Sequence, residues 1–244
     1  MANSTYDIRT EILSLRSFYR GLWLREEGTR FLLEGKLGYC ASYDRTANAF
    51  VLNPATDDAH NVIRDTYEIR IDFPSDFPSS FPSVREVGGR IDKIMKEKGI
   101  TDERDLHVSP DNGIICLCVE PEKYLLFQNG VSVVDYLNRL VVPYFYGLSY
   151  FQKRGKWPWG FYSHRDLSVL ESYLRNRNPA DTKLVRIYFE CLKEVKVKEL
   201  FSTKGAIQRQ CVCPCGKPAK FRNCHRDAFL GARLLKEDYD SISN

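Results

Sequence analysis

The chain has 244 residues, of which 43% are hydrophobic and 28% charged, and its net charge is +4. This composition excludes a collagen-like chain, a coiled-coil rod and a disordered tail, and the length fits one large domain with a small appendage. The longest apolar run, from Leu140 to Phe151, is about half of a membrane span and contains Pro143 and Gly147, so no transmembrane helix is predicted. The first 14 residues lack the apolar core of a secretory signal, and we expect a cytoplasmic protein.

The first half of the chain predicts one helix followed by strands. Residues 6–27 have apolar side chains at the spacing of an amphipathic helix, whereas residues 31–39 and 48–53 are typical of short strands. Residues 66–73 alternate between apolar and polar side chains, which predicts a half-buried strand. Prolines then recur every four residues beside phenylalanines in residues 73–84, which predicts an extended, aromatic-packed loop.

Helices dominate the predictions that follow. A strand is expected over 83–91, a short surface helix over 91–98, and a turn that leads into a compact apolar stretch over 107–119. Helical spacing returns at 131–146, where Ser132 is a candidate cap, and again at 165–174.

Turn residues at 176–179 mark the predicted domain boundary, which gives a first domain of residues 1–177 and a second of residues 178–244. The second domain is expected to begin with one basic amphipathic helix over 182–201. From Lys183 to Arg222 the chain has ten Lys or Arg against three Glu, so this segment carries +7 and the remainder a small negative charge. Such a segment can meet nucleic acid or an acidic partner, although a solvated helix face is the more usual meaning.

The eight cysteines are unevenly distributed. Four of them, Cys211, Cys213, Cys215 and Cys224, lie within 14 residues, which in a reducing compartment indicates metal or thiol chemistry rather than a disulfide scaffold. The segment from Cys213 to His225 has the spacing C-x-C-x8-C-H. Cys213, Cys215, Cys224 and His225 therefore match the four ligands that a structural zinc ion requires. Cys211 forms a second C-x-C pair with Cys213 and leaves the register open by two residues.

The order of motifs in the first domain resembles the ubiquitin-conjugating enzymes. A strand is followed by Phe77-Pro-Ser-Ser-Phe-Pro-Ser-Val84, then His107, then Gly113-Ile-Ile-Cys-Leu117. The resemblance covers roughly residues 6–175 and implies an α+β fold with an antiparallel sheet flanked by helices, to which a small helical, zinc-binding module is added. It identifies Cys116 as the nucleophile, which would carry the C-terminal acyl group of a protein as a thioester and transfer it to an amine.

The sequence departs from the family pattern at the residues before the cysteine. His107 lies nine residues before Cys116, and Ser109 occupies the position of the family's asparagine, which is thought to stabilise the oxyanion. Asn112 does not align with that asparagine and is a possible oxyanion donor, with backbone amides as the alternative. His107 is expected to be a structural residue of the active-site loop. Cys118 is an alternative nucleophile that would share a face with Cys116 in a strand.

Several roles stay open at this point. Glu120, Glu122 and Asp135 are candidates for deprotonating the amine, and Trp157, Trp159 and His164 are expected to be packing and partner-surface residues. The stretch that contains them, residues 155–164, resembles a signature of the prokaryotic conjugating-enzyme-like proteins. That resemblance implies a setting in CBASS-type antiphage defence, where such an enzyme attaches the C-terminus of a nucleotidyltransferase to a target.

The C-terminal cysteines resemble a second family signature, the SEC-C motif, which generally serves as a small docking module. The expected partners are an activating enzyme, a ubiquitin-like or nucleotidyltransferase donor and an acceptor protein. Neither a membrane nor a nucleic acid is expected as a partner. Two alternatives to the conjugating enzyme are a catalytically silent adaptor, which binds protein or RNA through the zinc module and basic helix, and a second zinc held by His107, Cys116 and Cys118.

Overall fold

In the computed structural model, the described residues are 8–44, 46–47, 49–54, 62–127, 131–159, 163–202 and 205–243. The chain forms two compact units: the first contains Met1–Leu117 and Asn129–Gly160, and the second contains Cys118–Gln128 and Phe161–Asn244. In the described ranges, no helix combines the length and the apolar character that crossing a membrane requires.

The first unit is built on an antiparallel sheet. Its strands are β1 (Leu22–Glu27), β2 (Arg30–Asp44), β3 (Ala49–Leu52), β4 (Ile63–Phe73) and β5 (Ser83–Glu86). They pair in the order β1-β2-β4-β5, and β3 pairs with the end of the long strand β2. Alternate residues of β4, including Tyr67, Ile69 and Ile71, are buried, which confirms the predicted half-buried strand. The sheet therefore has one face on the core and one face toward solvent.

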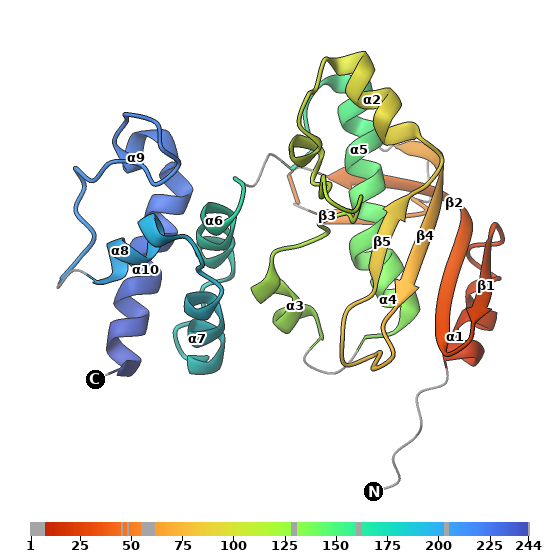
Figure 1. The fold of residues 1–244 in the computed structure, drawn as a ribbon, viewed down its shortest axis with the longest axis horizontal. Helices are drawn as coiled ribbons and strands as arrows, with labels where there is room; N and C mark the ends of the chain where they lie inside the picture. The colour runs from red at the N-terminus through yellow and green to blue at the C-terminus, as the bar shows by residue number, and fades with distance from the viewer. Residues whose placement is uncertain are drawn as a thin grey trace, which may run out of the picture. The chain divides into compact units, whose positions relative to one another are not determined.

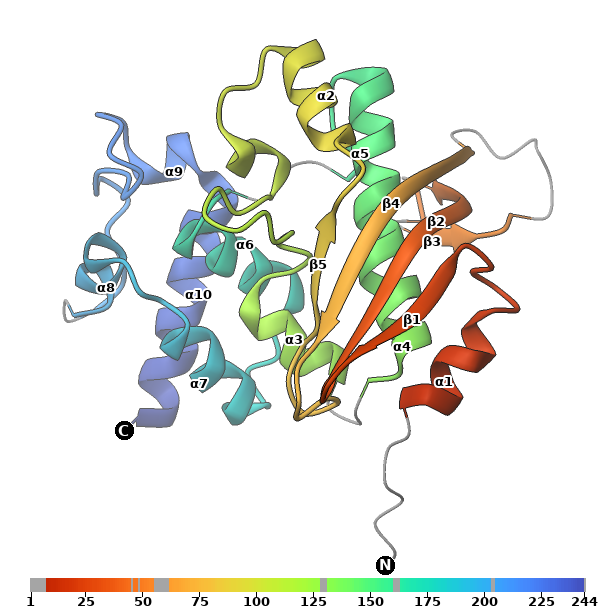
Figure 2. The ribbon, with the colours of Figure 1, turned by 45° about the vertical axis from the view of Figure 1, so that its right-hand side comes forward.

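Helices complete the first unit. They are α1 (Ile8–Leu15), α2 (Arg90–Lys98), the 3-10 turn η1 (Glu103–Leu106), α4 (Val133–Tyr136), the π-helical turn η2 (Leu137–Val141) and α5 (Val142–Arg154). Helix α5 crosses behind the sheet (Figures 1 and 2), where Phe145 contacts Tyr67 with ring centroids 4.5 Å apart. The hydroxyl of Ser132 accepts a hydrogen bond from the Asp135 N–H, so the predicted helix cap is confirmed. The wide turn η2 comes just before Pro143, which has no N–H to donate to the preceding turn.

A partly buried polar network joins two helices to the sheet. The Arg90 guanidinium in α2 donates to both oxygens of Asp65 in β4 at 2.7 and 2.8 Å, and the hydroxyl of Ser149 in α5 donates to Asp65 at 2.6 Å. Burial alone would raise the pKa of Asp65. The hydrogen bonds from Arg90 and Ser149 lower it by more than burial raises it, so the pKa of Asp65 lies below its usual value. Tyr39 and Tyr67 each form a hydrogen bond with Ser149. The network fixes α2 and α5 against the inner face.

The proline-rich segment between β4 and β5 forms the predicted aromatic-packed loop. Phe77 packs against Phe73 with ring centroids 5.0 Å apart, and Phe81 packs against Tyr136 at 6.0 Å. The Tyr136 hydroxyl also donates to the Pro82 carbonyl at 2.8 Å. The loop is therefore anchored to α4 through aromatic side chains.

The second unit is helical. Its helices are α3 (Glu120–Phe127), α6 (Asp166–Asn176), α7 (Thr182–Glu190), α8 (Val195–Ser202), α9 (Phe221–Cys224) and α10 (Arg226–Ser243). Helix α10 packs closely against α6, because Gly231 brings its backbone against the Leu170 carbonyl. Asp238 in α10 accepts hydrogen bonds from the Arg177 guanidinium at 2.8 Å and from the Tyr173 hydroxyl. These contacts join the two central helices of the unit.

Two predicted helices are wrong in extent. The helix predicted over 6–27 ends at Leu15, and Leu22–Glu27 is β1, because its residues pair with β2. The helix predicted over 182–201 is two helices, α7 and α8. The Asp166 carboxylate accepts the N–H groups of Lys193 and Glu194 at 2.8 and 2.6 Å, which begins the second helix separately.

The units also divide at a different place from the predicted boundary at 177/178. Helices α3 and α6, which the prediction assigned to the first domain, belong to the second unit. The turn at 176–181 joins α6 to α7, and both helices contribute to one buried core that includes Leu170, Tyr173 and Tyr188. The turn residues at 176–179 therefore form a loop within the second unit and do not separate the two units.

Candidate functional site

Residues 107–116 form a short hairpin, which we call the flap. Val108 and Ile115 pair as an antiparallel bridge, and the Cys116 N–H donates to the His107 carbonyl at 2.8 Å. At the tip, the Gly113 N–H donates to the Ser109 carbonyl at 2.8 Å, and Gly113 adopts a φ of +68°, a conformation that favours glycine. Hydrogen bonds within the flap therefore fix the backbone on which the predicted nucleophile lies.

Cys116 lies at the end of the flap with an exposed side chain, whereas the neighbouring Ile115 is buried. The segment from Cys116 to Val119 is not a strand, so the shared-face argument for Cys118 does not apply. Cys118 is half-buried. Of the two thiols, Cys116 is the more accessible to a bulky reactant.

The sheet and helix α5 support the flap. The Ile115 N–H donates to the carbonyl of Val84 in β5 at 2.9 Å, and the Arg85 Nε donates to the Asn112 carbonyl at 2.9 Å. Below the flap, the hydroxyl of the buried Tyr144 donates to the Leu106 carbonyl at 2.8 Å. Burial raises the pKa of Tyr144 well above its usual value, so it is a neutral hydrogen-bond donor. The sequence pattern identified neither Arg85 nor Tyr144, because a charged strand residue and a tyrosine in an apolar run carry no distinctive signal.

His107 occupies a structural position at the base of the flap. It ends η1 with a φ of +59°, and its N–H donates to the Arg104 carbonyl at 2.9 Å. Its ring packs edge-on against buried Trp157, with ring centroids 5.6 Å apart. These contacts agree with the predicted structural role of His107 and with packing by Trp157. The side chain of His164, by contrast, is exposed in the second unit.

The side chain of Asn112 takes part in the turn at the flap tip. Its Oδ1 accepts the Ile114 N–H at 3.0 Å, the arrangement of an Asx turn. Ser109, at the position of the family's asparagine, donates its backbone N–H to the Ile114 carbonyl at 2.9 Å. The role of Asn112 as an oxyanion donor stays a prediction.

The three candidate bases have different surroundings. Glu120 is exposed and lies 2.6 Å from Lys123. Glu122 accepts a hydrogen bond from the Ser172 hydroxyl at 2.7 Å within the second unit. Asp135 accepts the Ser132 hydroxyl at 2.8 Å in the helix cap. All three carboxylates therefore have a partner, and Glu120 and Asp135 are exposed whereas Glu122 is half-buried.

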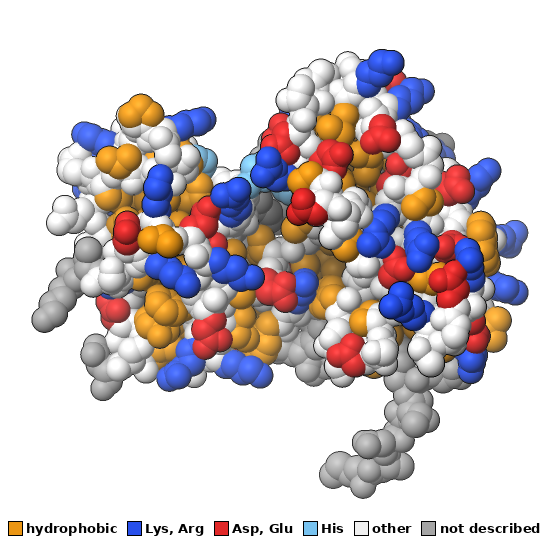
Figure 3. Space-filling view, in the orientation of Figure 1, with side chains coloured by type: hydrophobic (Ala, Val, Ile, Leu, Met, Phe, Trp, Pro, Cys, Tyr) orange, Lys and Arg blue, Asp and Glu red, His pale blue; other side chains and the backbone are white. Residues whose placement is uncertain are grey.

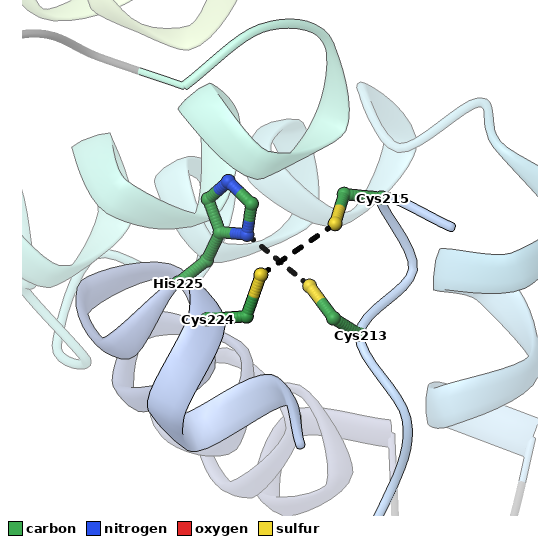
Figure 4. A group of neighbouring side chains, drawn as sticks. All are labelled: Cys213, Cys215, Cys224 and His225. Carbon is green, nitrogen blue, oxygen red and sulfur yellow. Dashed lines mark hydrogen bonds between the residues drawn. The ribbon is translucent and has the colours of Figure 1, made fainter. Parts of the chain in front are cut away.

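The C-terminal ligand set comes together as the spacing predicts. The potential ligand atoms of Cys213, Cys215, Cys224 and His225 all lie within 4.8 Å of one another and point toward a common centre (Figure 4). Cys213 Sγ lies 3.2 Å from His225 Nδ1, and Cys215 Sγ lies 3.7 Å from Cys224 Sγ. Tetrahedral zinc with Zn–S bonds of about 2.3 Å places two sulfurs roughly 3.8 Å apart. The group can hold a metal ion and is compatible with zinc.

A hairpin and a short helix position these ligands. The Cys213 N–H donates to the Ala219 carbonyl at 2.9 Å, and Gly216 makes the intervening turn with a φ of +88°. Burial raises the pKa of the Cys213 thiol to about 12, so bound metal must displace its proton. Cys211 instead pairs its backbone with Phe221, and its thiol lies outside the ligand group. Of the two overlapping C-x-C pairs, the one that joins the potential ligand group is therefore Cys213 and Cys215, not Cys211 and Cys213.

Among the residues that the structure describes, this is the one group of three or more potential ligands that lie close together. His107, Cys116 and Cys118 are all described and do not form another. The alternative of a second zinc site therefore has no support in the geometry.

Comparison of the chain with protein-family models, curated proteins and solved structures found no match. The assignment of function therefore rests on the residues and their arrangement.

Proposed function

We propose that the chain is a ubiquitin-conjugating-type acyl transferase with a zinc-binding appendage. The observation that carries the proposal is the position of Cys116: its side chain is exposed at the end of a hydrogen-bonded flap that is attached to an edge strand. The antiparallel order β1-β2-β4-β5, the preceding helix α1, the proline-rich loop and helix α5 across the sheet all agree with what the motif resemblance implies.

The proposed reaction uses the nucleophilicity and leaving ability of a thiolate. The Cys116 thiolate attacks the carbonyl carbon of a thioester on an activating enzyme, forms a new S–C bond and releases that enzyme's thiolate. An amine of the acceptor then attacks the same carbon, the amide bond forms, and Cys116 leaves as a thiolate. The amine's proton passes to a base, for which Glu120, Glu122 and Asp135 are the candidates.

The N–H groups of Ile114, Ile115 and Cys116 already donate hydrogen bonds, so the donor for the developing oxyanion is proposed to be another backbone amide or the side-chain amide of Asn112. The proposed polypeptide donor is a ubiquitin-like protein or the C-terminus of a nucleotidyltransferase, and the setting that the resemblance implies is CBASS-type defence. The donor's C-terminal tail must be extended to reach the exposed thiol.

Zinc is proposed as the resident metal of the C-terminal group, because three cysteines and one histidine form a closed ligand set without a position for substrate. Bound zinc supplies structural stability rather than chemistry. Exposed Lys217, Lys220 and Arg226 lie in or beside this segment and give it a positive surface. By its resemblance to SEC-C units, the module would dock a partner protein.

The experiment mixes the chain with a candidate activating enzyme, ATP and the donor, and separates the products without reductant. Wild-type protein should form an adduct that thiols cleave. Cys116→Ser should form an adduct that resists thiols and is cleaved by hydroxylamine, whereas the control Cys118→Ser should behave as wild type. Absence of an adduct with every donor, or an adduct that survives Cys116→Ala, would contradict the proposal.

A second candidate is a catalytically silent adaptor. Ser109 at the position of the family's asparagine favours it, because a serine side chain has no amide group to donate to the oxyanion. The adaptor would bind through the zinc module and the basic helices. If the chain is an adaptor, its Cys116→Ala variant should bind the partner as tightly as wild type does, and no thioester adduct should form in the charging assay.

A further inference from the structure

The outer face of the sheet has a row of ion pairs that crosses four strands. Arg25 in β1 lies 3.6 Å from Glu34 in β2, Glu34 lies 3.7 Å from Arg70 in β4, and Arg70 lies 2.9 Å from Asp72. The row ends at Arg85 in β5, whose Nη1 lies 2.6 Å from Asp72 Oδ2. Figure 3 shows basic and acidic side chains gathered over these strands of the first unit.

The strand register explains why Asp72 is needed in this row. Arg70 and Arg85 are directly paired residues of β4 and β5, so two like charges face one another across the ladder. Asp72 lies two residues along β4, on the same face, and bonds to both guanidinium groups. Its carboxylate therefore offsets their repulsion and holds the Arg85 side chain in one direction.

Arg85 also reaches beyond the sheet. While its Nη1 donates to Asp72, its Nε donates to the Asn112 carbonyl at the flap tip at 2.9 Å. The adjacent Val84 accepts the Ile115 N–H, so β5 holds the flap at two points, one next to Cys116 and one at the tip. The planar guanidinium makes these two bonds in fixed relative directions, which a lysine ammonium cannot do.

We propose that Arg85 is a positioning residue, which fixes the flap in the conformation that presents Cys116 for acyl transfer. The effect of Arg85 on acyl transfer rests on the proposed function. The ordering of the flap by Arg85 rests only on the contacts of Arg85 with Asp72 and Asn112. Arg85 is about one third exposed, and one hydrogen bond of a partly exposed charged group changes an equilibrium by about five- to tenfold.

The test compares Arg85→Gln with Arg70→Gln, a matched control. Both variants remove one arginine from the same ion-pair row, and the Arg85 and Arg70 side chains are 31% and 37% exposed, but Arg70 pairs with Glu34 and Asp72 in the sheet rather than with the flap. In the protein alone, amide hydrogen exchange of flap residues should be about five- to tenfold faster in Arg85→Gln and unchanged in Arg70→Gln. Arg85→Lys should restore part of the protection, since it keeps the charge but not both bonds.

Thioester formation supplies the second measurement. Arg85→Gln should lower the turnover of charging about fivefold, with the KM for the activating enzyme unchanged, and Arg70→Gln should leave both constants as in wild type. Equal flap exchange in the two glutamine variants would overturn the inference. If wild type forms no thioester while the exchange difference persists, the proposed function fails and the ordering of the flap by Arg85 stands.

Discussion

The substitution Gly231→Ala should destabilise the second unit through a backbone clash between α10 and α6. An alanine Cβ at this position would lie 1.8 Å from the Leu170 carbonyl oxygen and 2.7 Å from its carbonyl carbon. Because carbon and oxygen atoms normally pack no closer than about 3.4 Å, the helices would have to separate by roughly 1.5 Å. The clashing atoms are backbone, so no side-chain rotation can relieve the contact.

The size of the effect follows from two opposing contributions. Overpacking of a tight core typically costs about 1–3 kcal/mol, and more where backbone must move. Alanine in a helix gains about 1 kcal/mol over glycine. The helix separation also loosens the fully buried contacts around Tyr173 and Leu235. We expect a net loss of about 2 kcal/mol, or roughly 10 °C in melting temperature for a unit on the order of 100 residues.

The distribution of tryptophans allows each unit to be followed separately. Trp23, Trp157 and Trp159 are the chain's three tryptophans, and all lie in the first unit. Thermal unfolding of metal-loaded protein would therefore be followed by far-ultraviolet circular dichroism, which includes the helices of the second unit, and by tryptophan fluorescence, which reports the first.

Gly147→Ala is the reciprocal control, because its Cβ would lie 2.7 Å from Trp157 ring atoms in the first unit. Gly231→Ala should lower the helical transition, and Gly147→Ala the fluorescence transition. An unchanged or higher helical midpoint in Gly231→Ala would refute the reasoning, because helix propensity would then outweigh the clash.

Two further predictions concern metal and pH. Freshly purified protein should contain one zinc per chain by elemental analysis; Cys215→Ser should lose it and lower the helical melting temperature, whereas Cys211→Ser should keep it, and zinc in both variants would contradict the ligand assignment. The pKa of Asp65 lies below its usual value, so its pairing with Arg90 stabilises the first unit above the ordinary carboxyl range, and this stabilisation is lost as pH falls through the folded-state pKa. The urea midpoint by tryptophan fluorescence should fall more between pH 6 and pH 3 in wild type than in Asp65→Asn, and equal falls would show that another group dominates.

The sequence predicts the elements whose signals are local. Alternation identified β4, proline spacing identified the loop after it, and the C-x-C-x8-C-H spacing identified the ligands that the structure brings together. Because the ligands of this cluster lie within 13 consecutive residues, a short hairpin and one helix turn suffice to assemble it.

Features that depend on distant residues could not be predicted in this way. The apolar spacing of Leu22 and Trp23 fits a helix, but pairing with β2 makes this segment a strand. Asp166 separates α7 from α8 through contacts 27 and 28 residues away in sequence. The support of the flap by Arg85 depends in the same way on strand register, which neither residue pattern nor motif spacing reveals.

The most direct test of the central claim is to locate the acyl group on the charged protein. Cys116→Ser, charged with the activating enzyme, ATP and the donor, would be digested and the modified peptide sequenced by mass spectrometry. The account predicts an oxyester that joins the donor's C-terminal carboxyl to residue 116, and loss of this peptide in Cys116→Ala. A donor found on Cys118 or a lysine in the wild-type charging reaction, with residue 116 unmodified in every sample, would contradict it.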